Sequence, residues 1–198
     1  MNLELLTELC ETPGPSGREE PIRQVVRREL EPLAGEVSVD PLGNLVALRP
    51  GRGGPRLMLS AHMDEIGFMG SKPIHLMSDA DKGRAPKLED KPHERITALG
   101  AGAAVKIYDA GTIVPRRMVE HLVAVAEERA IPHQIEVLPR GSTDTRELAL
   151  SGDGAAAGCV SIPTRYIHQV VETCHPGDID ACVGLVTAFC ETAQALVE

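Results

Sequence analysis

In the second half of the chain, short apolar runs alternate with longer segments in which apolar residues recur every three or four positions. Three runs have the length and pattern of strands: 103–109, 133–139 and 158–163. Because helices between strands pack on the faces of the sheet, this alternation predicts a three-layer α/β/α domain with helices on both faces. A length of 198 residues suits one such domain carrying a small insertion.

Four segments have helical periodicity. Residues 116–129 place four apolar side chains on one face: Met118, Leu122, Val125 and Ala126. Residues 177–197 predict a long final helix that opens at or near Asp178. The N-terminal part predicts helices over 1–12 and 18–30. Ser16 and Glu19 have the spacing of a capping box that begins the second of these helices.

The region between these helices and the alternating half is less regular. Residues 36–40 and 44–50 predict two strands joined by a turn, and the apolar run 56–62 predicts a buried central strand. Residues 70–95 are polar, rich in Lys and Asp and weakly periodic, which is typical of a loop, a linker or a small insertion.

The composition limits the classes of partner. A net charge of −9 argues against binding to a nucleic-acid backbone, which requires a basic surface. The 5 Cys include no CxxC pair, a pattern typical of reduced thiols in the cytosol. The N-terminus lacks the features of a signal peptide, and no segment predicts a membrane span. We therefore expect a cytoplasmic protein.

The first candidate for chemistry is the pair His62 and Asp64, directly after the run 56–62. Open α/β sheets bind ligands at the carboxyl ends of their strands. A carboxylate near a ligating histidine can fix the tautomer of the ring. The pair therefore predicts a metal ligand with an orienting partner. The alternative is a turn histidine followed by a helix-capping aspartate.

Two further sites follow strands in the second half. His168 lies a few residues after 158–163, so it could share a metal with His62, although a packed or surface histidine is the alternative. Gly141, Ser142, Thr143 and Asp144 predict a loop whose backbone N–H groups could bind a substrate carboxylate or an oxyanion. The alternative is that one of these side chains caps a helix.

Together these stretches resemble one family, the tetrahedral aminopeptidases of metallopeptidase family forty-two, which includes glutamyl and deblocking aminopeptidases. The similar stretches follow one another in family order: "LCETPGPSGRE", "DPLGNLVA", "LSAHMDEIGFM", "GSKPIHL", "AVKIYD", "AIPHQIEVLPRGSTD" and "SIPTRYIH". Some members were once labelled endoglucanases. "SAHMDEIGFM" and "SIPTRYIH" are highly specific in combination.

The resemblance implies a zinc-exopeptidase-like α/β domain with an inserted β-barrel lid. It implies that His62 and His168 bind two different metal ions, Zn²⁺ or Co²⁺, and that Asp64 is the catalytic-site residue that orients His62. The loop 141–144 is similar to a substrate-side loop. The resemblance also implies a peptide substrate and a homo-oligomer, since family members form dodecamers. Residues 1–69 and 96–198 would be the two parts of the peptidase domain, and 70–95 a remnant of the lid.

The chain departs from the family in what it lacks. The family has a bridging aspartate, a glutamate that acts as general base and two more carboxylate ligands, and this sequence has no matching residues for them. Two adjacent metal ions need such carboxylates to bridge them and to offset their charge. The sequence therefore predicts a metal-dependent aminopeptidase-type hydrolase whose activity is impaired in this short form. The alternatives are a non-catalytic, internally deleted relative that acts as a binding or assembly subunit, and a printed chain that omits segments of the protein.

Overall fold

The computed structural model describes residues 1–65, 96–169 and 171–196. The chain divides into two compact units, one over Asn2–Leu76 and the other over Met77–Glu198 together with Met1. The polar segment 70–95, for which the sequence predicts a loop, a linker or an insertion, lies outside the described residues.

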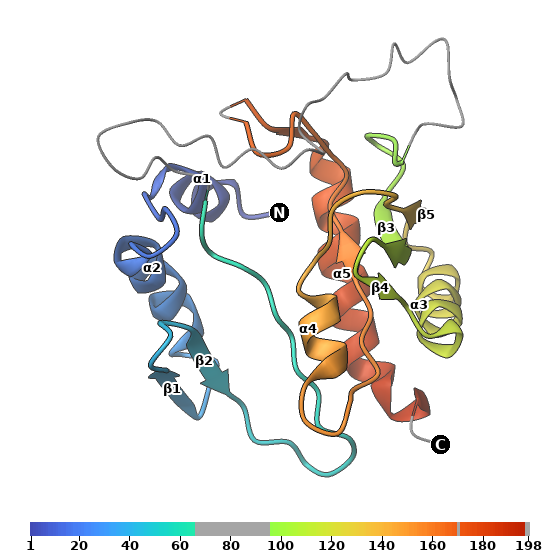
Figure 1. Ribbon diagram of the computed structural model, residues 1–198, viewed down its shortest axis with the longest axis horizontal. Coiled ribbons are helices and arrows are strands. Elements are labelled where there is room, and N and C mark those ends of the chain that lie inside the picture. Colours follow the sequence, from blue (N-terminus) through green and yellow to red (C-terminus); the bar gives the residue numbers. More distant parts are fainter. Residues whose placement is uncertain (66–95, 170, 197–198) are drawn as a thin grey trace. The chain divides into compact units, whose positions relative to one another are not determined.

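The N-terminal unit contains two helices followed by a hairpin (Figure 1). Its elements are α1 (Leu3–Glu11), α2 (Glu20–Leu30), β1 (Glu36–Val39) and β2 (Leu45–Leu48). The two strands are antiparallel, with Val37 opposite Ala47. The Asp40 carboxylate accepts hydrogen bonds from the backbone N–H groups of Leu42 and Asn44, which closes the turn. These elements confirm the predicted helices and the predicted hairpin.

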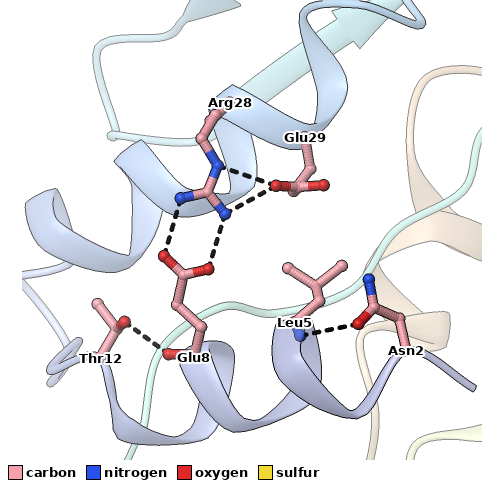
Figure 2. A network of polar contacts seen from close by, with 6 residues as sticks. All are labelled: Asn2, Leu5, Glu8, Thr12, Arg28 and Glu29. Atoms are coloured by element: carbon pink, nitrogen blue, oxygen red, sulfur yellow. Dashed lines mark hydrogen bonds and ion pairs between the residues drawn. The ribbon is translucent and has the colours of Figure 1, made fainter.

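Arg28 joins the two helices (Figure 2). Its guanidinium donates two hydrogen bonds to Glu8 of α1, of 2.8 and 2.7 Å, and two more to Oε1 of the neighbouring Glu29. Asn2 caps α1 by accepting from the backbone N–H of Leu5. A bidentate arginine–carboxylate pair has a fixed geometry. The contact therefore sets the spacing of the helices that flank the turn containing Gly14 and Ser16.

The predicted capping box at the start of α2 is wrong. The N-cap residue is Glu19, and its side chain makes no capping hydrogen bond. The Glu19 carboxylate instead accepts from the backbone N–H of Gly17, and the Ser16 hydroxyl donates to Asp64, 48 residues away. The Ser16 hydroxyl, which the local spacing predicts to cap α2, therefore binds the distant Asp64 carboxylate instead.

The predicted central strand at 56–62 is also wrong. These residues are in no strand, and the side chains of Leu57, Met58 and Leu59 are 44%, 72% and 61% exposed. A strand needs a neighbouring strand to accept and donate its backbone hydrogen bonds. Within the described part of the N-terminal unit, β1 and β2 pair only with each other, and residues 56–62 add to neither of their outer edges.

The C-terminal unit is built around β3 (Ala103–Asp109). It pairs with three strands: in parallel with β5 (His133–Val137), and antiparallel with β4 (Thr112–Ile113) and β6 (Val160–Ser161). The segment between β3 and β5 contains α3 (Arg116–Glu128), so these elements form a strand–helix–strand unit. The three predicted strands are present, although β6 is shorter than predicted.

The core of this unit is where α3 and α5 (Pro176–Thr192) pack with β3 (Figure 1). Ala103 and Val105, alternate residues on one face of β3, belong to the buried cluster. So do the four residues predicted for the apolar face of 116–129: Met118, Leu122, Val125 and Ala126. The α/β class predicted from the sequence is confirmed.

The last helix begins near Asp178, as predicted. It starts at Pro176, and the His175 ring accepts the Gly177 backbone N–H at 3.1 Å as its cap. Asp178 is buried, and its carboxylate accepts the backbone N–H groups of Gly100 and Gly102 at 2.8 and 2.7 Å. Gly102 has φ +92°, and a Cβ there would lie 2.1 Å from the Pro132 carbonyl oxygen, so only glycine fits.

The segment Pro176–Leu196, which adds the 3₁₀ helix η3 (Ala193–Leu196) to α5, has the length and mean hydropathy, 1.3, that a membrane span requires. Its side chains nevertheless behave as those of a core helix. Ala181, Cys182, Leu185 and Ala188 are buried in the cluster with β3 and α3. We therefore assign the segment to the core of the C-terminal unit.

A buried ion pair crosses from β3 to β5. Lys106 and Glu136 are register partners, and Lys106 Nζ lies 2.9 Å from Glu136 Oε1. The two side chains are 1% and 7% exposed. Glu136 Oε2 is buried without a hydrogen-bond partner among the described residues. Removing one member of a buried pair leaves the other charge uncompensated, whereas removing both does not.

We expect Lys106→Met to destabilise the protein by about 3–5 kcal/mol, because Glu136 is then buried alone. The double variant Lys106→Met/Glu136→Leu should recover most of this loss. Urea unfolding of the wild type, both single variants and the double variant measures the coupling. Additive effects of the two substitutions would contradict a coupled pair.

Candidate functional site

His62 and Asp64 lie on an irregular segment of the N-terminal unit. His62 Nδ1 is 3.0 Å from the Asp64 backbone oxygen and 3.4 Å from its Oδ1. Both neighbouring atoms are hydrogen-bond acceptors, so Nδ1 must carry the ring proton and donate. The Nε2 lone pair is then available, on a side chain that is 75% exposed. This arrangement fits one neutral imidazole ligand of a metal ion.

The turn before α2 is bound to this segment by its backbone. The Glu65 N–H donates to the Gly14 carbonyl at 2.9 Å, and the Gly14 N–H donates to Glu65 Oε1 at 3.1 Å. Gly14 is buried, and a Cβ there would lie 2.5 Å from Ile22 Cγ2. The absence of a side chain at Gly14 therefore lets the two segments meet.

The loop 141–144 belongs to the C-terminal unit and precedes α4 (Thr145–Leu150). The N-cap residue of α4 is Asp144, whose side chain makes no capping hydrogen bond. Thr143 turns instead toward Asp109, the last residue of β3, whose Oδ2 accepts from its hydroxyl at 2.8 Å and its backbone N–H at 3.1 Å. Asp109 Oδ1 accepts from the Gly111 N–H. The end of β3 thus fixes the shape of the loop.

The environment of Asp109 favours its charged form. Burial alone would raise the pKa of this carboxyl, but the hydrogen bonds from Thr143 and Gly111 and the positive charge of Lys106 outweigh burial. The pKa of Asp109 is consequently lowered. The carboxylate therefore remains ionised and keeps its hydrogen bonds to the loop near neutral pH.

His168 lies between β7 (Thr164–Arg165) and β8 (Thr173–Cys174), which pair antiparallel. Its backbone has φ +59°, in the left-handed region that non-glycine residues rarely adopt. The His168 backbone N–H donates to the Glu172 carboxylate within the same loop. Residues held in this conformation cluster at functional sites because the surrounding contacts must enforce it.

The structure thus builds each predicted part separately. His62 and Asp64 are together, and the loop 141–144 is held by Asp109, while His168 is in a different loop of the C-terminal unit. Within the described ranges, no three His, Cys, Asp or Glu side chains gather closely enough to hold a metal ion. A metal ion at His62 would therefore have one protein ligand from the described part of the chain, whereas a zinc site takes three or four protein ligands.

Sequence reasoning missed two residues that shape these parts, Ser16 and Asp109. The sequence pattern predicts Ser16 as a helix cap, and it includes Asp109 only as the last residue of a strand. A signal was available for Asp109, since a charged residue that ends a buried strand next to a glycine turn needs donors for its carboxylate. Ser16 had no such signal, because its acceptor is far away in the sequence.

A sequence model of the M42 glutamyl aminopeptidase family matches residues 80–185, more than half of the 198 residues. The chain belongs to this family. The match includes the loop 141–144 and His168, and it ends before α5 does.

Individual relatives are similar over stretches of different length. FrvX of Escherichia coli is 46% identical over 69 residues, which are 35% of this chain and 19% of FrvX. A lysyl aminopeptidase of Pyrococcus furiosus is 27% identical over 145 residues, covering 70% of this chain and 41% of that protein. The chain therefore spans less than half the length of these M42 relatives.

Solved structures with the same fold include further aminopeptidases. A TET aminopeptidase from a marine-sediment thaumarchaeon has a TM-score of 0.80 at 18% identity, over 94% of this chain and 96% of that one. The PhTET1 structure, a dodecamer in its asymmetric unit, has a TM-score of 0.73 at 19% identity, over 96% and 99%. These similarities support the α/β fold that the M42 family match indicates.

The hydrogen bonds of Asp109 should contribute to the stability of the protein in a way that depends on pH. We expect Asp109→Asn to lower the free energy of unfolding by about 1–3 kcal/mol near pH 7, because the part-buried donors of Thr143 and Gly111 lose a charged acceptor. A carboxyl with a lowered folded pKa contributes stability above its unfolded pKa of about 3.9, and this is lost as the pH falls through the folded value. The difference between wild type and variant should therefore shrink on acidification.

Urea unfolding at pH 7 and at pH 3 checks both parts. Thr143→Val should also destabilise at pH 7, whereas Thr143→Ser, which keeps the hydroxyl, is the matched control. Equal stability of wild type and Asp109→Asn at pH 7 would contradict this role for the carboxylate.

Proposed function

We propose that this M42 chain is a metal-dependent, aminopeptidase-type peptide hydrolase with impaired catalysis in its 198-residue form. In this proposal His62 and His168 bind divalent metal, Zn²⁺ or Co²⁺, and Asp64 orients His62. The loop 141–144 contacts the peptide. The protein acts in the cytoplasm as a homo-oligomer. The domain division of 1–69, 70–95 and 96–198 into a peptidase domain interrupted by a lid remnant is part of the same proposal.

The observation that carries this proposal is the geometry of His62 in a member of the M42 family. Its Nδ1 faces two acceptors of Asp64, and its side chain is 75% exposed. Imidazole nitrogen suits Zn²⁺ and Co²⁺, and a ligating histidine usually donates its other N–H to an oxygen acceptor. A bound ion would supply Lewis-acid polarisation of the peptide carbonyl. The protein's own residues would hold the ion and the peptide.

Impaired catalysis follows from the carboxylates that the sequence lacks. A hydrolytic site needs a base within reach of the attacking water, and no residue here matches the glutamate that has this role in the family. The same observation favours a second candidate function, a non-catalytic subunit that binds partners or other family subunits. PhTET1, a structural neighbour, is a dodecamer, which supports assembly as the activity that a shortened relative would retain.

The metal assignment predicts weak binding of Zn²⁺ or Co²⁺ that depends on both histidines. His62→Ala and His168→Ala should each lower the metal content of dialysed protein, measured by mass spectrometry of the metal. His133→Gln, at a histidine of β5 outside the assignment, is the control and should retain wild-type content. Unchanged content in both alanine variants would show that the assignment is wrong.

The catalytic proposal predicts little or no release of N-terminal residues by the 198-residue protein. Lysyl, glutamyl and leucyl p-nitroanilides and short peptides, with added Zn²⁺ or Co²⁺, provide the assay. The intact mass must first be verified as 21.2 kDa, because a larger mass would mean that segments are absent from the printed sequence. Rapid cleavage that a chelator abolishes would refute impairment and favour a complete site.

A further inference from the structure

Ser16 contacts the predicted metal-site pair from a distant part of the chain. Its hydroxyl donates to Asp64 Oδ2 at 2.5 Å, while Asp64 Oδ1 faces His62 Nδ1. The two oxygens of one carboxylate are therefore divided between a hydroxyl and an imidazole. A carboxylate held at only one oxygen can rotate, whereas one held at both has a defined plane.

The backbone places Ser16 at this position. Pro15 forms a parallel bridge with Glu65, and Gly14 and Glu65 exchange two hydrogen bonds. These contacts lie directly beside the Ser16–Asp64 bond, at residues 14 and 15 of one segment and at residue 65 of the other. The hydroxyl is thus directed at Asp64 by three neighbouring contacts, which explains why it serves the carboxylate and leaves α2 without a side-chain cap.

We propose that Ser16 is a positioning residue: its hydroxyl holds the Asp64 carboxylate so that Oδ1 faces Nδ1 of His62 and Nε2 is presented to solvent for a divalent metal ion. For the metal, this inference rests on the proposed function. For the ring itself it does not, since the Nδ1–H tautomer is a property of the metal-free protein. The Asp64 backbone oxygen, 3.0 Å from Nδ1, is the second acceptor, and the carboxylate adds a charge-assisted contact that favours the same tautomer.

The test compares the 198-residue protein with four variants. Ser16→Ala removes the hydroxyl and Ser16→Thr keeps it. Asp64→Asn replaces the carboxylate by a neutral amide and so removes the charge that favours a proton on Nδ1. Ser38→Ala changes an exposed serine of β1 in the same unit and is the control. Nitrogen-detected NMR of the histidine rings, with His62 assigned by the loss of its signals in His62→Ala, reports the tautomer of the metal-free protein at pH 8.

We expect the wild type, Ser16→Thr and Ser38→Ala to hold His62 as the Nδ1–H tautomer. Ser16→Ala and Asp64→Asn should raise the share of the Nε2–H tautomer. In a Co²⁺ titration, Ser16→Ala should bind about tenfold more weakly than Ser16→Thr, the loss typical when a partner of a ligating histidine is removed. Wild-type His62 signals in a folded Ser16→Ala protein would overturn the inference. If Ser16→Ala does not fold, wild-type His62 signals in Asp64→Asn would overturn it, because the carboxylate would then not determine the tautomer.

The experiment tests metal binding by His62 and positioning of His62 by Ser16 independently. If Co²⁺ does not bind the wild type through His62, the proposed function is wrong. The ring signals of the metal-free variants then still decide whether Ser16 positions His62. If Co²⁺ binds but the tautomer is insensitive to Ser16, the metal assignment survives and the positioning role does not.

Discussion

A strand that is buried and paired along both edges must satisfy every backbone group within the protein, because water cannot reach it. β3 is such a strand. Ala103 to Lys106 are buried. β5 pairs with one edge of β3, and β4 and β6 pair with the other edge. Its side chains then reach three places: the cluster with α3 and α5, the pair with Glu136, and, through Asp109, the loop 141–144.

This arrangement explains why the C-terminal unit could be predicted from its sequence. The residues of α3 that pack on β3 recur with helical spacing, so the pattern alone identified Met118, Leu122, Val125 and Ala126. The strands β3 and β5 are the two strands of one strand–helix–strand unit, whose alternating pattern is visible in the sequence. In this unit the local pattern and the tertiary contacts require the same structure.

The N-terminal unit shows where such reasoning ends. The run 56–62 has the composition of a buried strand, but composition does not supply a neighbouring edge, and the structure leaves Leu57 to Leu59 exposed. Ser16 has the spacing of a helix cap, yet its hydrogen bond goes to Asp64. Both errors have one physical origin: the deciding hydrogen-bond partner is distant in the sequence or absent from the described unit, so no local pattern could report it.

The same distinction applies to the candidate site. Motifs identified His62, Asp64, His168 and Thr143, and they also predicted that Asp64 orients His62. They did not identify the contact of Ser16 with Asp64 or that of Asp109 with Thr143. Asp109 and Asp64 make the same kind of contact. In each case the carboxylate accepts a hydrogen bond from a hydroxyl and also contacts a second polar group. In Asp109 the second group is backbone N–H, which shapes a loop, and in Asp64 it is an imidazole, which selects a tautomer.

These two carboxylate contacts are relevant to the function proposed for this M42 chain. Positioning a histidine and shaping a loop require hydroxyl and carboxylate groups that the chain has, whereas activating water requires a base that the sequence does not match to the family. Binding depends on the first set of groups and turnover on both. In the proposed function, a chain with these groups and no matched base would bind a metal ion or a peptide but would cleave peptides slowly. Metal binding and peptide hydrolysis consequently have to be measured as separate properties of this protein.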